Sequence, residues 1–118
     1  MRGSCLCGKV TFTIEGAARP VVACHCTQCR KTSGHYVAAT QVDVDRLHIE
    51  DGGSLTWFDS SAEAKRGFCS TCGSQLFWKM HSEDRISIMA GSLDGDTGLT
   101  TAKHIFTDTK GDYYNLPD

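Results

Sequence analysis

The chain has 118 residues, of which 40% are hydrophobic and 22% are charged, and its formal net charge is -2. This composition excludes a disordered or collagen-like chain, and the small acidic excess argues against a protein that binds nucleic acid or an anionic membrane. No apolar run approaches the roughly 20 residues that a membrane helix needs. No stretch has the composition of a linker, so we expect a single domain over residues 1–118.

Alternating apolar and polar residues predict short β-strands along the chain. The clearest alternation is at 9–15, where every second residue is apolar. Further strands are expected at Tyr36–Val42, Leu55–Phe58, Gln75–Lys79, Arg85–Ala90 and Ala102–Phe106. No segment sustains the 3.6-residue period of a helix, and only one short helical turn is expected, at Thr27–Thr32. The sequence therefore predicts a mainly β domain with a modest core, to whose stability a bound metal would contribute.

The cysteines carry the strongest functional signal. Their number is odd, so a complete set of internal disulfides is impossible. No secretory signal follows Met1, and we therefore expect a reducing, cytoplasmic compartment, where closely spaced cysteines bind metals or act in redox chemistry. The seven residues form three short clusters: Cys5-x-Cys7, Cys24-x-Cys26-x-x-Cys29 and Cys69-x-x-Cys72.

The outer clusters together can form one closed zinc site. A structural zinc needs four tetrahedral ligands with Zn–S distances near ~2.3 Å, and two cysteines in one tight turn can supply half of such a site. Gly8 and Gly73 directly follow these pairs and permit the necessary turns. We call this set the four-cysteine group: Cys5, Cys7, Cys69 and Cys72.

The remaining cysteines supply one ligand too few for a closed site. We call them the three-cysteine group: Cys24, Cys26 and Cys29. Reactive zinc sites keep one position open, whereas structural sites are closed. A closed site would need a fourth ligand from an aspartate or from one of four histidines: His35, His48, His81 and His104. His25 is expected to point away from the metal, and a redox dithiol at Cys26-x-x-Cys29 is a further alternative.

Five stretches, taken together, resemble a known family. They are Gly3–Val10, Cys24–Gly34, Arg66–Leu76, Ala90–Asp94 and His104–Phe106. In this order they are similar to the glutathione-dependent formaldehyde-activating enzyme family, which includes centromere protein V. The chain departs from the family pattern near its end, where Tyr113-Tyr114 follows Lys110-Gly111-Asp112 and the family usually has Trp after the lysine.

The resemblance implies small antiparallel sheets and hairpins around a structural zinc, as in the zinc-bound Rab-GTPase accessory protein. It implies that the four-cysteine group holds this zinc and that the three-cysteine group holds a second, labile zinc with a catalytic role. The implied activity is that of a carbon–sulfur lyase, which joins glutathione and formaldehyde in S-(hydroxymethyl)glutathione. The expected partners are a small thiol and an aldehyde, with no nucleic acid and no membrane, and no oligomeric state is predicted.

Glutathione also suggests where substrate contacts would lie. It carries two carboxylates, and Arg30 and Lys31 directly follow Cys29, so they could pair with these groups. Ser33 begins a turn whose N–H groups could face the ligand. Alternatively, Arg30 and Lys31 are solvated surface charges and Ser33 lies in an ordinary turn. The alternative function is a non-catalytic zinc protein that binds or carries glutathione or a protein partner.

Overall fold

The structure is a computed structural model in which residues 1–117 are described. Its elements, in chain order, are β1 (Arg2–Ser4), β2 (Thr11–Ile14), β3 (Val21–Cys24), α1 (Thr27–Ser33), β4 (Val37–Asp43), η1 (Val44–Arg46), β5 (Leu47–Glu50), β6 (Leu55–Asp59), β7 (Ala64–Cys69), β8 (Gln75–Met80), β9 (Arg85–Met89), η2 (Ala90–Ser92), β10 (Thr101–Ile105) and η3 (Thr107–Thr109).

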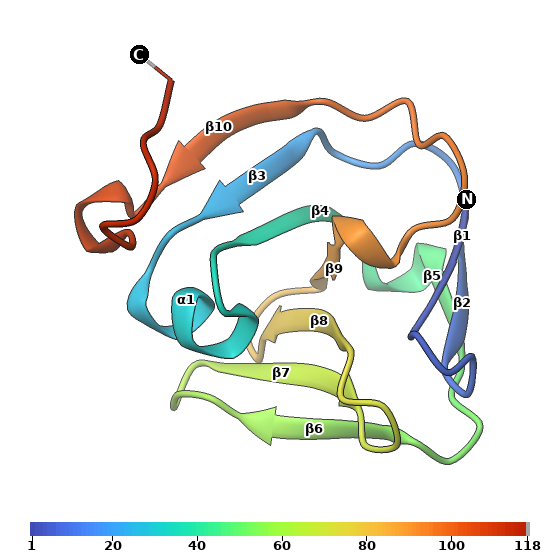
Figure 1. Cartoon of the computed structure of the whole chain (residues 1–118). Helices are drawn as coiled ribbons and strands as arrows, with labels where there is room; N and C mark the ends of the chain where they lie inside the picture. The colour runs from blue at the N-terminus through green and yellow to red at the C-terminus, as the bar shows by residue number, and fades with distance from the viewer. Residues whose placement is uncertain (118) are drawn as a thin grey trace.

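These strands form two sheets within the described residues. A three-stranded sheet has the order β1-β2-β5, and a seven-stranded sheet has the order β10-β3-β4-β9-β8-β7-β6. Neighbouring strands are antiparallel, except that β10 runs parallel to β3 (Figure 1). The mainly β fold with small antiparallel sheets is therefore confirmed, and the parallel edge pair is an addition to it. No helix in this part of the chain is long and apolar enough to cross a membrane.

Every strand expected from the sequence is present, with ends that shift by at most two residues. Four strands were not predicted, namely β1, β3, β5 and β7. β1 has three residues and β5 has four, which is too short for a clear period. β7 carries a buried arginine, Arg66, followed by Gly67, and this pair obscures the alternation in a strand that is mostly buried.

The main core lies where the two sheets pack together. Phe12 on β2 meets Phe77 on β8 edge to face, with ring centroids 5.3 Å apart. Four successive residues of β9, Ile86–Met89, are buried. Ile86 and Ile88 belong to this core, whereas Ser87 and Met89 line a cavity on the opposite face of the sheet. The seven-stranded sheet thus has the core on one face and a cavity on the other.

Gly3 lies at a close approach between β1 and the core. A Cβ atom at this position would lie 2.3 Å from Cζ of Phe12 and 2.5 Å from the backbone oxygen of Ser92. We expect Gly3→Ala to lower the free energy of unfolding by about 1–3 kcal/mol, because the core must shift to admit the methyl group. The matched control is Gly91→Ala, since a Cβ at Gly91 meets nothing within 4 Å.

The test is urea denaturation of both variants beside the parent chain. Gly91→Ala is expected to change the free energy of unfolding by no more than about 0.5 kcal/mol. Equal stabilities for the two variants would contradict the close packing of Gly3 against Phe12 and Ser92.

Candidate metal centres and the adjoining cavity

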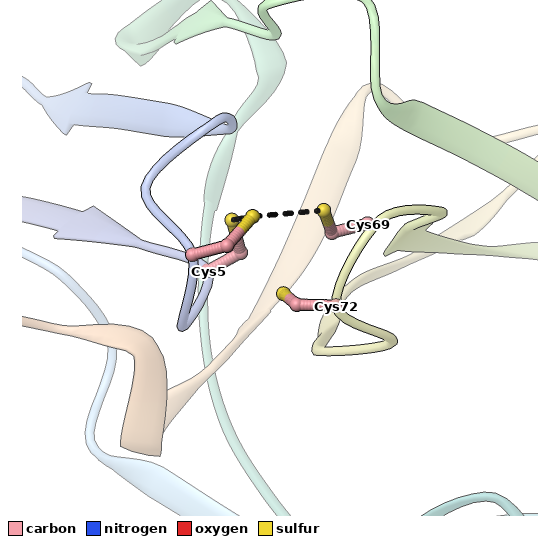
Figure 2. A group of neighbouring side chains, drawn as sticks. Cys5, Cys69 and Cys72 are labelled. Carbon is pink, nitrogen blue, oxygen red and sulfur yellow. Dashed lines mark hydrogen bonds between the residues drawn. The ribbon is translucent and has the colours of Figure 1, made fainter.

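The four-cysteine group comes together from two turns that are distant in sequence. Cys5 and Cys7 lie in the turn between β1 and β2, while Cys69 ends β7 and Cys72 lies in the following turn. Figure 2 shows the sulfur atoms of Cys5, Cys69 and Cys72 directed toward one another from these two segments. All four Sγ atoms lie within 4.8 Å of one another, and the structure therefore places a set of four possible metal ligands here.

The sulfur spacing agrees with a tetrahedral thiolate site. The Sγ atom of Cys7 lies 3.6 Å from that of Cys5 and 3.7 Å from that of Cys69. Zinc–sulfur bonds of about 2.3 Å in a tetrahedron require S–S edges of about 3.8 Å. The donor set and its geometry thus fit zinc.

Both turns direct donors at the sulfur atoms. Gly8 and Gly73 have φ angles of 81° and 80°, in the left-handed region that favours glycine. The backbone N–H of Val10 donates to Cys5 Sγ over 3.3 Å. Hydrogen bonds from the hydroxyl and the backbone N–H of Ser74 lower the pKa of Cys72 to about 5. These hydrogen bonds favour the thiolate forms of Cys5 and Cys72, whereas desolvation and hydrogen bonds with the neighbouring thiols raise the pKa of Cys7 to about 11.

The three-cysteine group lies where β3 leads into α1. Cys24 ends β3, Cys26 is the N-cap of α1, and Cys29 lies in its first turn, with the backbone N–H of Cys29 donating to Cys26 Sγ over 3.3 Å. The three Sγ atoms lie within 4.8 Å of one another. Within residues 1–117, no histidine, aspartate or glutamate joins this group, so the structure offers three thiol ligands without a fourth side chain.

Arg66 lies directly beside this group. Its guanidinium is buried, and Nη2 lies 3.6 Å from Sγ of Cys29 and 3.5 Å from Oε1 of Gln28. The hydrogen bond from Cys24, together with those from Arg66 and Cys26, lowers the pKa of Cys29 to about 5. The same interaction with Cys29, with burial, raises the pKa of Cys24. The neighbouring thiols, together with the cationic Arg66, therefore stabilise a thiolate at Cys29.

The three cysteines and Arg66 open onto one cavity of about 350 Å³. The cavity lies on the face of the seven-stranded sheet opposite the main core. Every second residue of β3 and β4 faces it, including Val22, Ala39 and Gln41, and it also receives Trp78 from β8. Phe106 lines it just after β10 and is 61% exposed. The three-cysteine group thus has direct access to a space of ligand size.

The other predicted contact residues lie on α1, outside the residues that line this cavity. Lys31 and Ser33 are exposed, and the Ser33 hydroxyl donates to the backbone oxygen of Cys29 over 2.7 Å. Arg30 is half-buried, and its Nε has no hydrogen-bond partner among the described residues. Contact between these three residues and a thiol ligand stays a prediction. The charged residue that lines the cavity beside the cysteines is instead Arg66. The sequence pattern included it only as the first residue of the stretch Arg66–Leu76 and did not predict a role for it.

Comparison with known proteins identifies the relationship. The family model described as glutathione-dependent formaldehyde-activating enzyme matches residues 1–109. The chain belongs to this family. The match includes both cysteine groups, Arg66 and the strands that enclose the cavity.

Relatives of this family occur in bacteria and a fungus. A Halomonas elongata protein named "Putative glutathione-dependent formaldehyde-activating enzyme" is 25% identical over 126 residues, covering 98% of this chain and 80% of its own length. A protein of the same name from Talaromyces marneffei is 30% identical over 81 residues, covering 67% of this chain and 43% of its own length. A crystal structure of a Rhodobacter sphaeroides protein superposes with a TM-score of 0.69 at 25% identity, covering 88% of this chain and 99% of that chain.

The C-terminal segment, beyond the part matched by the family model, covers a buried histidine. His25 is 0% exposed; its Nδ1 bonds the hydroxyl of Tyr114, and its Nε2 lies 2.9 Å from Nδ1 of His104. Burial and the neighbouring His104 lower the pKa of His25, which favours the neutral ring. A neutral imidazole donates from one nitrogen and accepts at the other, so both of its nitrogens are satisfied.

The contact with Tyr114 should contribute measurably to stability. Replacing Tyr114 by Phe leaves Nδ1 of His25 buried without its partner, and we expect a loss of about 1–3 kcal/mol in the free energy of unfolding. The control is Tyr113→Phe, because Tyr113 is 59% exposed and its substitution should have little effect. Thermal unfolding of both variants makes the comparison, and equal midpoints would show that Tyr114 does not hold His25.

Proposed function

We propose that this chain is a zinc-dependent carbon–sulfur lyase that joins glutathione and formaldehyde in S-(hydroxymethyl)glutathione. Membership of the formaldehyde-activating family supports the pair of substrates. The observation that carries the proposal is the three-cysteine group, which offers three thiol ligands beside a cavity and a buried cation.

We propose in addition that zinc occupies both cysteine groups. The four-cysteine group would hold the closed, structural ion, and the three-cysteine group would hold the second one. Thiol donors with this spacing favour zinc over magnesium or calcium, which prefer oxygen ligands. When bound by three thiolates, zinc supplies a coordination position at which a small thiol is held as its thiolate.

The chain's own residues would then assist the addition. The sulfur of glutathione attacks the carbonyl carbon, a C–S bond forms, and the π electron pair moves to the oxygen, which takes a proton from water. The thiol proton leaves to water, so the reaction is a net addition. Arg66 provides N–H groups close to Cys29, where they can stabilise the negative charge that develops on the oxygen. The cavity walls exclude water and hold the two reactants together.

The test is exchange NMR of glutathione and formaldehyde with their adduct, on protein whose zinc content is verified by elemental analysis. We expect the protein to increase the exchange rate at least 100-fold over the uncatalysed reaction, and we expect this effect to disappear when the second zinc is removed by a mild chelator. Protein that holds both ions and causes no acceleration would exclude this pair of substrates and favour the alternative of a thiol carrier.

A further inference from the structure

The cavity is much larger than formaldehyde requires. Its volume of about 350 Å³ corresponds to about twelve water molecules at about 30 Å³ each. Formaldehyde has one carbon and one oxygen, and beside the thiol group of glutathione it would occupy only a small part of this space. A substrate that fills the cavity must carry a larger substituent.

The chemistry of the wall indicates what that substituent is. Most of the wall is apolar, and it is built from residues on several strands, including Val22, Ala39, Trp78, Met89 and Phe106. Burying charged or amide groups against such a wall without partners is unfavourable, whereas each buried methylene group is favourable. Most of the wall therefore suits an aliphatic or aromatic group.

The polar groups of the wall are largely engaged with one another. Arg19 donates to the backbone oxygen of Ala39 over 3.0 Å and to Oε1 of Gln41 over 3.5 Å. The side-chain amide of Gln41 donates in turn to the hydroxyl of Ser87 over 3.3 Å. These three residues form a chain of hydrogen bonds along one side of the cavity, which limits their capacity to bind a polar ligand.

Two charged residues of the wall lie outside this chain of hydrogen bonds. Glu63 is exposed, whereas Arg66 is only 4% exposed. Because Arg66 is cationic and lines the cavity, an acceptor atom of a ligand would be favourable beside it. Since Nη2 of the same side chain lies 3.6 Å from Sγ of Cys29, this acceptor would lie next to the three-cysteine group. One acceptor atom beside an apolar space describes an aldehyde with an apolar substituent.

We propose that the cavity binds aldehydes larger than formaldehyde, with the carbonyl oxygen at Arg66 and an apolar substituent against the wall. This inference rests on the proposed thiol–aldehyde addition and names the aldehyde class. The reaction is unchanged in balance: the thiol sulfur bonds to the carbonyl carbon, the C=O π pair goes to oxygen, and the proton lost by the thiol is replaced by one gained at that oxygen. The product is a hemithioacetal with the apolar chain on its carbon.

The experiment compares formaldehyde, propanal and hexanal with glutathione by exchange NMR on zinc-verified protein. The quantity measured is the acceleration of each exchange over its own uncatalysed rate. Because each buried methylene contributes about fourfold, we expect the acceleration to increase at least tenfold from formaldehyde to hexanal. An acceleration that stays constant or falls with chain length overturns the inference.

Two matched variants place the effect in the cavity. Val22 lines the cavity, and Val22→Phe should lower the ratio of hexanal to formaldehyde acceleration at least fivefold. Val44 is 38% exposed in η1 and does not line the cavity; Val44→Phe should leave the ratio unchanged. Equal ratios in the two variants would mean that the aldehyde chain does not bind in this cavity, and they would overturn the inference.

A binding measurement separates this inference from the proposed activity. Hexanamide keeps the carbonyl oxygen and the chain but does not undergo addition. We expect it to shift the indole N–H signal of Trp78, which lines the cavity, and to leave that of Trp57, which packs against the main core. Acetamide at the same concentration should shift neither. Accelerated formaldehyde exchange with no shift at Trp78 contradicts this inference alone. A shift at Trp78 with no acceleration of any aldehyde contradicts the proposed addition and supports binding of an apolar carbonyl compound in the cavity.

Discussion

Replacing Cys69 by Ser is expected to leave the chain unfolded. Cys69 is 0% exposed in the main core, and its sulfur lies 3.7 Å from that of Cys7. The proposed zinc in the four-cysteine group would contribute on the order of 10–16 kcal/mol, which equals or exceeds the roughly 5–15 kcal/mol of net stability that is typical of a domain. A serine hydroxyl is a poor zinc ligand, and at this position it would also be buried.

The measurement is far-UV circular dichroism together with the zinc content of the purified variant. We expect loss of the β-sheet spectrum and no retained metal. The parent chain treated with a strong chelator should give the same spectrum. A folded Cys69→Ser protein with one zinc fewer than the parent would show that the four-cysteine group is not required for the fold.

Replacing Cys26 by Ser is expected to remove the activity and keep the fold. Cys26 is the N-cap of α1, where its sulfur accepts the backbone N–H of Cys29. Serine is a favoured N-cap residue, so the hydrogen bond and the helix should persist. The three-cysteine group, however, would lose one of its three thiolates, and with it the proposed second zinc. We expect glutathione–formaldehyde exchange to slow at least 100-fold.

Zinc content, circular dichroism and exchange NMR on the same sample check this expectation. The Cys69→Ser chain is the matched control, because it makes the same chemical change in the other group. Unfolding of the Cys26→Ser variant would contradict separate roles for the two groups. Retained exchange after loss of one zinc would place the chemistry outside the three-cysteine group.

The turns that carry the cysteines could be anticipated because the necessary information is local. Each pair in the four-cysteine group lies in a turn marked by a following glycine, Gly8 or Gly73, and the observed φ angles match that function. The three-cysteine group lies within six residues of sequence, so the junction of β3 with α1 largely determines its shape. Tight turns with closely spaced cysteines and a following glycine can be predicted from the sequence.

The cavity could not be anticipated, because it depends on how distant strands pair. Val22 reaches the wall through β3, Trp78 through β8, and Phe106 through the parallel pairing of β10 with β3. Arg66 appears in sequence as one charged residue near a cysteine pair. Arg66 reaches Cys29 of the three-cysteine group only because of the register in which β7 pairs in the sheet. Its position before Gly67, Phe68 and Cys69 was the one signal in the sequence that it lies in a mostly buried strand.

The separation of the two turns in the four-cysteine group also bears on folding kinetics. Cys7 and Cys69 are 62 positions apart, and closing a loop of that length costs about 3–4 kcal/mol of chain entropy. The hairpins β6–β7 and β7–β8 form from neighbouring segments and need no such closure. Contacts of long sequence separation form late, and interactions absent from the folding transition state act mainly on the unfolding rate. A metal bound by the four-cysteine group should therefore lengthen the lifetime of the native chain far more than it speeds its formation.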